Sequence, residues 1–194
     1  MKKKNNIINI ILSNVKTLLG ALIIALLIRS LFFQPFYIPS SSMEPTLLVG
    51  DRIFVSKYSY GYSKHSFPFS PSITEKRFFS KVPKQGDLVV FKTPTDNRTD
   101  YIKRLIGLPG DQIQFIEGEL FINDKKVSRK KIKSPKKIRC GNFILETQTF
   151  IEALPNGVKH LASYNKDGTL QNTKKYIVPD NHFFLMGDNR DCSK

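Results

Sequence analysis

The sequence is poor in the residue types that mark several classes of protein. It has two cysteines, Cys140 and Cys192, no tryptophan, and 11 glycines and 11 prolines among 194 residues. Two cysteines are too few for a disulfide framework or a cysteine-based zinc module, and this little glycine and proline excludes a collagen-like chain. Because 40% of the residues are hydrophobic, wholesale disorder is excluded too. The length suits one domain, or one domain with a modest insertion.

Acidic residues are also scarce: the sequence has 16 of them and 31 basic residues, which gives a net charge of +15. Residues 1–16 contribute +4 and residues 124–139 contribute +8, so the remaining chain is nearly balanced. A run such as 124–139 usually forms a solvated loop or strand face. It contains no aromatic residue that could stack on bases, so we expect no nucleic acid partner. Anionic lipid head groups fit its charge better.

The first 16 residues carry four lysines and no acidic residue, and an apolar stretch overlaps and follows them. This pattern permits a cleaved signal peptide, a buried core helix or an uncleaved membrane anchor. The stretch ends in Leu31, Phe32 and Phe33, whose bulky side chains fit a small-x-small cleavage site poorly, and a core helix rarely begins behind lysines. We therefore expect a cytoplasmic tail over residues 1–6 and a transmembrane anchor over residues 7–33, with the remaining chain on the far side.

Long amphipathic helical patterns are absent after the anchor. Short runs rich in β-branched and aromatic residues replace them, separated by turn residues such as glycine, proline, asparagine and aspartate. Glu117-Gly118 lies between two such runs and predicts a hairpin. The predicted fold class is therefore mainly β, with an antiparallel β domain behind one N-terminal transmembrane helix.

Several motifs for enzyme chemistry are missing. There is no P-loop, no H-E-x-x-H, no G-x-G-x-x-G and no G-x-S-x-G, so we expect neither a metal nor a cofactor. The three histidines, His65, His160 and His182, lie in predicted loops or turns without a neighbouring nucleophile motif. A serine activated by a lysine is the remaining nucleophile arrangement.

Two segments could supply such a pair, although each also has a simpler interpretation. Ser40, Ser41 and Ser42 lie in the segment 39–47, which is either a polar linker or a constrained turn that presents a nucleophile. Lys103 and Arg104 are neighbours in an apolar strand-like run, and strand alternation sends their side chains to opposite faces. If Lys103 is buried, desolvation lowers its pKa and makes it a general base, whereas on an edge strand it is simply solvated.

Together these segments resemble the type I signal peptidases, the bacterial leader peptidase family. The resemblance rests on four boxes in the family's order: residues 39–51, 86–91, 101–111 and 187–193. It implies a β-rich catalytic core over residues 36–112 and 176–194, interrupted by a β-rich inserted subdomain over residues 113–175. It also implies a membrane-bound serine endopeptidase that removes signal peptides from exported preproteins through an acyl-enzyme.

The resemblance assigns a role to each matching residue. Ser42 is the implied nucleophile and Lys103 the general base, with Ser193 orienting the lysine. Ser40 belongs to the implied oxyanion hole, and Arg104 with Asp188 forms a supporting pair. The implied substrate pockets select small side chains and are shaped by nine residues: Phe36, Ile38, Pro39, Met43, Leu47, Ile53, Val90, Tyr101 and Ile102.

The implied partners are preprotein signal peptides and the lipid bilayer, and the implied location is the bacterial inner membrane, with the catalytic part on its outer face. Two departures from the family accompany this. Cys192 stands where the family usually has asparagine, and the family's last box continues beyond Lys194, so we expect a truncated core. We expect no disulfide, because no close cysteine pair lies in the insertion.

Two alternatives remain open. One is a self-cleaving protease of the repressor type, which keeps the serine–lysine pair. The predicted N-terminal anchor and the lack of a DNA-binding helix pair in the sequence argue against this alternative. The other is a catalytically inactive, membrane-tethered β domain that binds lipid or a protein partner through residues 124–139.

Overall fold

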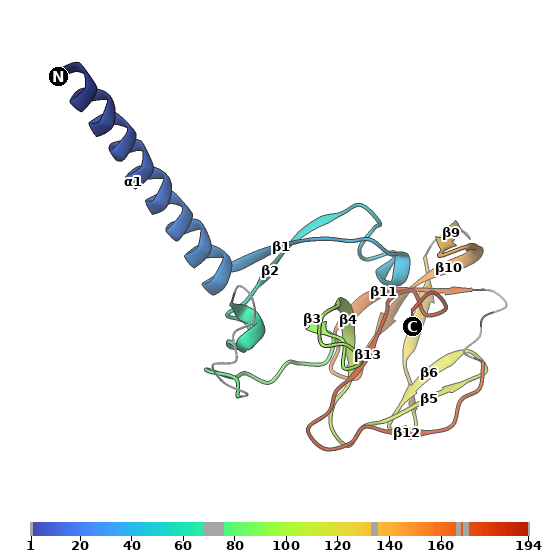
Figure 1. Cartoon of the computed structure of the whole chain (residues 1–194). Coiled ribbons are helices and arrows are strands. Elements are labelled where there is room, and N and C mark those ends of the chain that lie inside the picture. Colours follow the sequence, from blue (N-terminus) through green and yellow to red (C-terminus); the bar gives the residue numbers. More distant parts are fainter. Residues whose placement is uncertain (1, 68–75, 133–135, 166–167, 169–170, 194) are drawn as a thin grey trace. The chain divides into compact units, whose positions relative to one another are not determined.

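The computed structural model describes residues 2–67, 76–132, 136–165, 168 and 171–193 (Figure 1). It is mainly antiparallel β with one long helix at the N-terminus, which confirms the predicted fold class. The chain forms two compact units, Met1–Phe36 with Phe54–Val82 and Tyr37–Ile53 with Pro83–Lys194. Each unit is described by itself below.

The first unit is dominated by helix α1, Lys2–Leu31. Within it, the 24 residues Ile8–Leu31 are long and apolar enough to cross a membrane, and none of the span is buried inside the structure. At 1.5 Å per residue they extend about 36 Å, which exceeds the roughly 30 Å hydrocarbon core of a bilayer. Large side chains such as Leu18, Leu22 and Ile23 are more than half exposed. The alternative of a buried core helix is therefore wrong.

The chain leaves α1 through strand β1, Phe33–Tyr37, which pairs with β2, Arg52–Ser56, in a two-stranded sheet. The Tyr62 hydroxyl donates a hydrogen bond to the carbonyl oxygen of Leu31 at 2.8 Å, which ties the loop after β2 to the end of the helix. A short 3-10 helix, η2, spans Lys64–Ser66 and contains His65.

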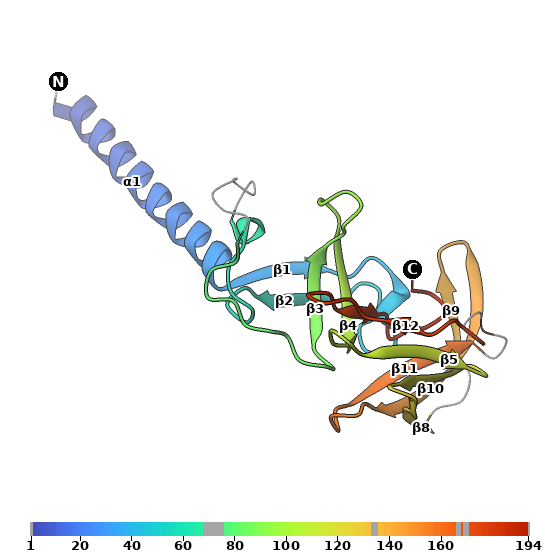
Figure 2. The same cartoon turned by 90° about the horizontal axis from the view of Figure 1, so that it is seen from below.

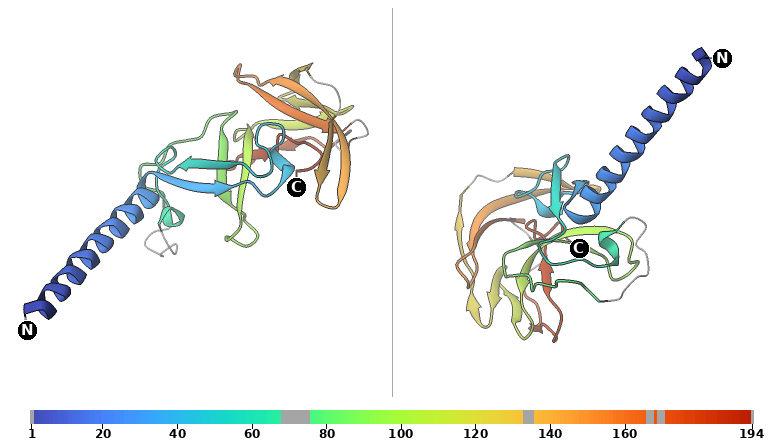
Figure 3. Two further views of the ribbon diagram at one scale, coloured as in Figure 1. Left: turned by 90° about the horizontal axis from the view of Figure 1, so that it is seen from above. Right: turned by 90° about the vertical axis from the view of Figure 1, so that its left-hand side faces the viewer.

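Three antiparallel sheets build the second unit (Figures 2 and 3). The first has the order β13–β4–β3, the second β12–β5–β6–β7, and the third β11–β10–β8 with β9 also paired to β10. The strands are β3 Leu88–Lys92, β4 Asp100–Gly107, β5 Gln112–Ile116, β6 Glu119–Ile122, β7 Lys125–Lys126, β8 Ser128–Lys131, β9 Lys136–Cys140, β10 Phe143–Ala153, β11 Lys159–Asn165, β12 Tyr176–Ile177 and β13 Phe184–Met186.

Alternation along these strands creates the core of the second unit. In β5, Ile113 and Phe115 are buried, and their register partners in β6, Ile122 and Leu120, are buried with them. Ile106 from β4 belongs to the same cluster of apolar side chains. The predicted hairpin at Glu117-Gly118 joins β5 to β6, and both residues have positive φ angles, 51° and 73°. Such a turn matches the twist of the strands that it joins.

The ends of the predicted insertion lie side by side. Tyr176 in β12 pairs with Ile113 in β5, and Ile177 pairs with Gln112. The chain therefore leaves and re-enters the predicted core at neighbouring points, as an insertion requires. The insertion lies in the same compact unit as most of the predicted core, apart from residues 36 and 54–82, so the division into core and insertion stays a prediction.

The expectation of no disulfide is wrong, because Cys140 and Cys192 form one. They are 52 residues apart in sequence, with Cα atoms 5.5 Å apart, a normal span for a disulfide. The prediction failed because it considered only cysteine pairs within the insertion. This pair instead joins the end of β9 to the segment after β13.

Candidate active site

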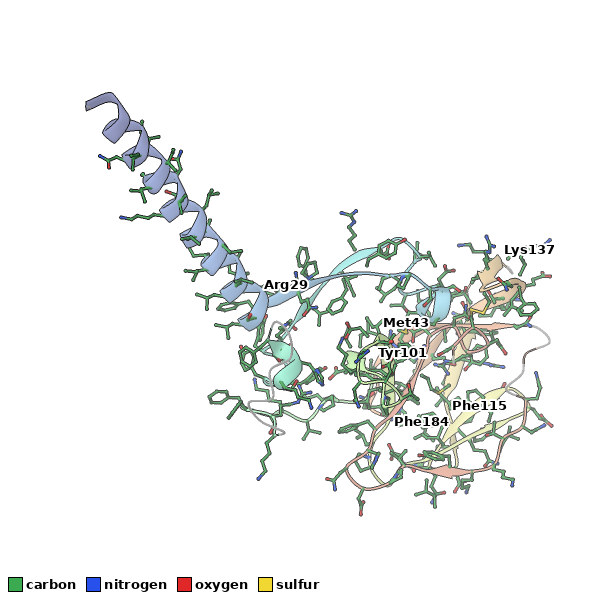
Figure 4. The ribbon with its side chains drawn as sticks, viewed as in Figure 1. Arg29, Met43, Tyr101, Phe115, Lys137 and Phe184 are labelled. Atoms are coloured by element: carbon green, nitrogen blue, oxygen red, sulfur yellow. A yellow bond between two sulfur atoms is a disulfide. The ribbon has the colours of Figure 1, made fainter. Side chains whose placement is uncertain are left out.

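The implied nucleophile lies on a tight turn. Residues Ser41–Met43 form a 3-10 helix, η1, and Ser40 before it is extended. The backbone N–H of Asn189 donates to the carbonyl oxygen of Ser42 at 3.1 Å, and the Asn189 side-chain amide donates to the carbonyl oxygen of Ser41 at 3.2 Å. Met43, which Figure 4 labels, is fully buried. The backbone around Ser42 is thus fixed on both sides while the Ser42 side chain remains half-buried.

Two hydroxyl groups face each other on this turn. The Ser40 and Ser42 hydroxyl oxygens are 3.3 Å apart, and either can donate. Ser40 is exposed, so its hydroxyl can also reach a group that approaches from solvent. A hydroxyl beside the nucleophile can act as a donor to an oxyanion.

Strand β4 presents Lys103 and Arg104 on opposite faces, and both are only 6% exposed. The Lys103 amine donates to the Ser193 hydroxyl at 2.8 Å and lies 5.7 Å from the centre of the Tyr101 ring. Burial lowers the pKa of the Lys103 amine, because a buried charge loses hydration. A lysine in this setting is neutral more often than a solvated one, which is the state a base needs.

Arg104 has a carboxylate partner, whereas Lys103 has none among the residues that the structure describes. Its guanidinium donates to both carboxylate oxygens of Asp188, at 2.8 and 2.7 Å, and to the carbonyl oxygen of Gly86 at 2.7 Å. The Thr46 hydroxyl also donates to Asp188. Asp188 is fully buried, so this pair joins β4, the segment after η1 and the segment after β13 without water between them.

Gly187 lies between the nucleophile turn and Ser193, the residue to which Lys103 is hydrogen-bonded. Its backbone N–H donates to the Ser193 hydroxyl at 3.1 Å. A Cβ atom built on Gly187 would overlap both the carbonyl oxygen of Ser42 and the Ser193 side chain. Ser42 and Ser193 are therefore close neighbours, with Lys103 bonded to the second. Within the described part of the chain, no hydrogen bond joins the Ser42 hydroxyl directly to the Lys103 amine.

A cleft of about 290 Å³ opens beside Lys103, and its walls include Phe91, Pro94, Tyr101 and Leu185. Tyr101 is the one predicted pocket residue among the described lining of this cleft. Sequence reasoning missed Phe91, although it lies opposite Tyr101 in the β3–β4 register.

The other predicted pocket residues of the second unit have varied environments. Ile38 and Met43 are buried, Val90 and Ile102 are half-buried and paired in register, Leu47 and Ile53 are half-buried, and Pro39 is exposed. Phe36 belongs to the first unit, where it is half-buried in β1.

The family model described as "Signal peptidase, peptidase S26" matches residues 11–194. The chain belongs to this signal peptidase family. Its serine turn, buried lysine and terminal Asp-Asn-Arg-Asp segment all lie within the matched residues.

Named signal peptidases from several species resemble the chain. Signal peptidase I of Rickettsia canadensis is 44% identical over 184 residues, which cover 88% of this chain and 66% of that protein. Signal peptidase I of Rickettsia felis is 43% identical over 185 residues with the same coverage. Signal peptidase I of Rickettsia bellii is 40% identical over 192 residues, which cover 92% of this chain and 63% of that protein. The chain thus spans just under two thirds of the length of these signal peptidases.

A second buried polar cluster of this signal peptidase family member was not predicted from the sequence. Arg190 donates to Glu152 at 2.7 Å and to the Tyr164 hydroxyl at 3.0 Å, and Nε2 of His160 lies 3.3 Å from Glu152. All four side chains are buried. Burial alone would raise the pKa of Glu152, but Arg190 and the hydrogen bonds from His160 and Tyr164 lower it to about 2. Burial raises the pKa of Tyr164.

This cluster corrects the position predicted for one histidine. His160 lies in strand β11 and is buried, not in a loop. His182 lies in a turn, with its Nδ1 2.8 Å from the carbonyl oxygen of Asp180. No sequence signal predicts the cluster, because Glu152, His160 and Arg190 come from separate elements. Asn189, which holds the nucleophile turn, was missed for the same reason.

Proposed function

We propose that this chain is the catalytic part of a membrane-bound serine endopeptidase that removes signal peptides from exported preproteins. The observation that carries the proposal is the Lys103 amine, which is buried, has a lowered pKa and is hydrogen-bonded to Ser193 beside the nucleophile turn. A buried lysine without a carboxylate partner suits a general base better than a structural cation.

The first half of the reaction forms an acyl-enzyme. The neutral Lys103 amine takes the proton of the Ser42 hydroxyl while the Ser42 oxygen attacks the scissile carbonyl carbon. The Ser40 hydroxyl and the Ser42 backbone N–H donate to the developing oxyanion. The C–N bond then breaks, and the Lys103 ammonium returns the proton to the departing amine. An ester between Ser42 and the signal peptide remains.

Water completes the reaction. Lys103, neutral again, takes a proton from a water molecule that attacks the ester carbonyl, and Ser42 leaves with that proton. Ser193 holds the amine in position throughout both halves. The Arg104–Asp188 ion pair joins β4 to the segment after β13. These two residues therefore position the site and do not transfer a proton.

The substrate class follows from the family and the anchor. Helix α1 is the proposed anchor in the bacterial inner membrane, with the N-terminus in the cytoplasm and the β units on the outer face. Signal peptides emerge from the same bilayer. The substrate would lie extended near residues 37–40 and 100–102, with small side chains in pockets shaped by Ile38, Met43 and the other predicted residues.

The test is cleavage of a preprotein by the detergent-solubilised chain. Ser42→Ala and Lys103→Ala each remove a group on which the chemistry depends, and we expect each to lower kcat at least about a thousandfold. Lys103→Arg should be as inactive as Lys103→Ala, because arginine is not deprotonated in proteins. Ser80→Ala and Lys84→Ala, at exposed positions, are matched controls. Near-normal cleavage by Ser42→Ala or Lys103→Ala would refute the mechanism.

A second candidate function is a tethered β domain that binds anionic lipid without catalysis. Its support is the run 124–139, whose described part carries the exposed cations Lys125, Lys126, Lys130, Lys131, Lys136, Lys137 and Arg139. Figure 4 labels Lys137, on the hairpin of β9 and β10. Binding to anionic vesicles with no cleavage of any preprotein would favour this function over the peptidase.

A further inference from the structure

The disulfide between Cys140 and Cys192 lies against the serine turn. The Ser41 hydroxyl donates to the carbonyl oxygen of Arg139 at 2.7 Å, and it lies 3.0 Å from the sulfur of Cys192. Ser41 precedes the nucleophile and is buried. One side chain of the turn therefore contacts Cys192 and the residue that precedes Cys140.

The same disulfide is one residue away from the group that holds the lysine. Cys192 directly precedes Ser193, whose hydroxyl accepts from Lys103 at 2.8 Å and from the Gly187 backbone at 3.1 Å. Upstream, Asp188 is fixed by Arg104 and Arg190 by Glu152. The disulfide adds a covalent hold directly at the position where the serine must face the lysine.

We propose that the Cys140–Cys192 disulfide is a positioning element for the active site, which holds Ser193 against Lys103 and supports the serine turn, so that turnover depends on the oxidation of these two cysteines. This inference rests on the proposed function. Cys140 and Cys192 are positioning residues, because they act through Ser193 and Ser41 and not on the substrate.

The redox step is ordinary thiol–disulfide exchange. Formation takes two electrons and two protons from the thiols of Cys140 and Cys192 and passes them to a disulfide oxidant, which leaves as a dithiol. A dithiol reductant such as dithiothreitol reverses the step and becomes a cyclic disulfide. An outer-face location, as proposed for this unit, is a compartment in which such bonds persist.

Loss of the disulfide has a specific consequence at Lys103. The lowered pKa of its amine depends on exclusion of water. If Ser193 is no longer held, water reaches the amine, its pKa rises and a smaller fraction is neutral at a given pH. A purely structural disulfide far from the site would change stability without this effect.

The experiment measures the pKa of Lys103 directly in the folded, detergent-solubilised chain. Competitive acylation with a trace of acetic anhydride across a pH series, followed by mass spectrometry, gives the pKa of each lysine amine. The oxidised chain is compared with the same preparation after dithiothreitol, so no variant has to fold. We expect the pKa of Lys103 to rise by about one unit on reduction, while the acetylation of the exposed Lys84 is the same in both samples.

Kinetics on the same samples give the second readout. With a peptide substrate, below the pKa of Lys103, we expect kcat to fall about tenfold on reduction, because one pKa unit changes the neutral fraction tenfold. KM should stay unchanged, and the acidic limb of the pH profile should move to higher pH. Cys140→Ser should match the reduced chain. The double variant Cys140→Ser with Cys192→Asn should no longer respond to dithiothreitol.

The outcomes separate this inference from the proposed function. An unchanged Lys103 pKa after complete reduction, verified by mass spectrometry, overturns the positioning role whether or not the chain cleaves anything. A shifted pKa in a chain whose cleavage is unaffected by Ser42→Ala keeps the positioning role and overturns the proposed chemistry. A fall in melting temperature with no change in the Lys103 pKa or kcat would make the disulfide a structural staple and refute the inference.

Discussion

Two buried polar clusters in the second unit surround a basic side chain with different partners. Around Glu152 and Arg190 the cation has a carboxylate at 2.7 Å and a tyrosine hydroxyl at 3.0 Å. Among the described residues, the Lys103 amine has the Ser193 hydroxyl and the Tyr101 ring as neighbours and lies at the edge of a cleft. Pairing a buried charge stabilises it, whereas an unpaired buried amine sheds its proton more readily. The first arrangement favours stability and the second favours reactivity.

The free energy follows the same division. Because the pKa of Lys103 is lowered in the folded state, the folded protein holds this proton less tightly than the unfolded chain does. Burial of Lys103 therefore costs stability, in full at pH values below its folded-state pKa. A lowered carboxyl pKa, as at Glu152, contributes stability at neutral pH. Burial of Lys103 thus lowers the stability of the fold at the proposed catalytic site, whereas the Glu152–Arg190 pair raises it.

The largest effect should come from removing the counter-charge of Arg190. Glu152→Gln removes the carboxylate that is hydrogen-bonded to the buried Arg190 guanidinium, and we expect a loss of about 4 kcal/mol in the free energy of unfolding. Urea denaturation of the detergent-solubilised chain measures it. The control is Glu146→Gln, on the exposed part of β10. Equal stability of the two variants would mean that the paired cluster contributes nothing to the fold.

Acid should produce a somewhat smaller loss by protonating the same carboxylate. The pKa of Glu152 is about 2 in the folded protein, below the ordinary value of 4.5, so its contribution is fully present above pH 4.5. It is lost as the pH falls through about 2, and the shift corresponds to about 3 kcal/mol. Unfolding free energies measured across this range test the expectation. In Glu152→Gln this part of the pH dependence should vanish, and if it persists, other carboxylates are responsible.

The smallest of the three effects should follow from giving Lys103 a partner like that of Arg190. Ser193→Asp brings a carboxylate to the amine, which should raise the pKa of Lys103 by about two units and lower kcat/KM at neutral pH about a hundredfold. Ser193→Ala is the control, because it removes the hydroxyl without adding charge. The acidic limb of the kcat/KM profile should move to higher pH in Ser193→Asp. An unmoved limb would show that Lys103 is not the titrating base.

Much of the fold was predictable because its signals are local. The β class follows from short apolar runs and turn residues, and the hairpin at Glu117-Gly118 follows from a two-residue turn. Local patterns underestimated strand length, since β10 spans Phe143–Ala153, whereas the apolar run that predicted it covers residues 143–145. In the basic run, strands β8 and β9 form because β10 offers them a pairing edge, which local propensity does not reveal.

Chemistry alone predicted only part of the site, and the pairing of Arg104 with Asp188 came from the family resemblance. Alternation in β4 separates Lys103 from Arg104, but both proved to be buried, because Asp188 from a distant segment supplies the carboxylate that lets Arg104 enter the interior. The disulfide and the Glu152–Arg190 cluster unite residues far apart in sequence. Such contacts depend on the complete set of sheet pairings, so a single sequence carries no signal for them.

The short connection between helix α1 and the serine turn limits where the proposed chemistry can occur. The helix ends at Leu31 and the nucleophile turn begins at Ser41, so even a fully extended chain keeps Ser42 within about 40 Å of the helix end. If α1 anchors the chain in a bilayer, as proposed, Ser42 is confined to a layer of this thickness next to the membrane surface. For a substrate anchored in the same membrane, this layer sets a high effective concentration, and weak pockets for small side chains are then sufficient for capture.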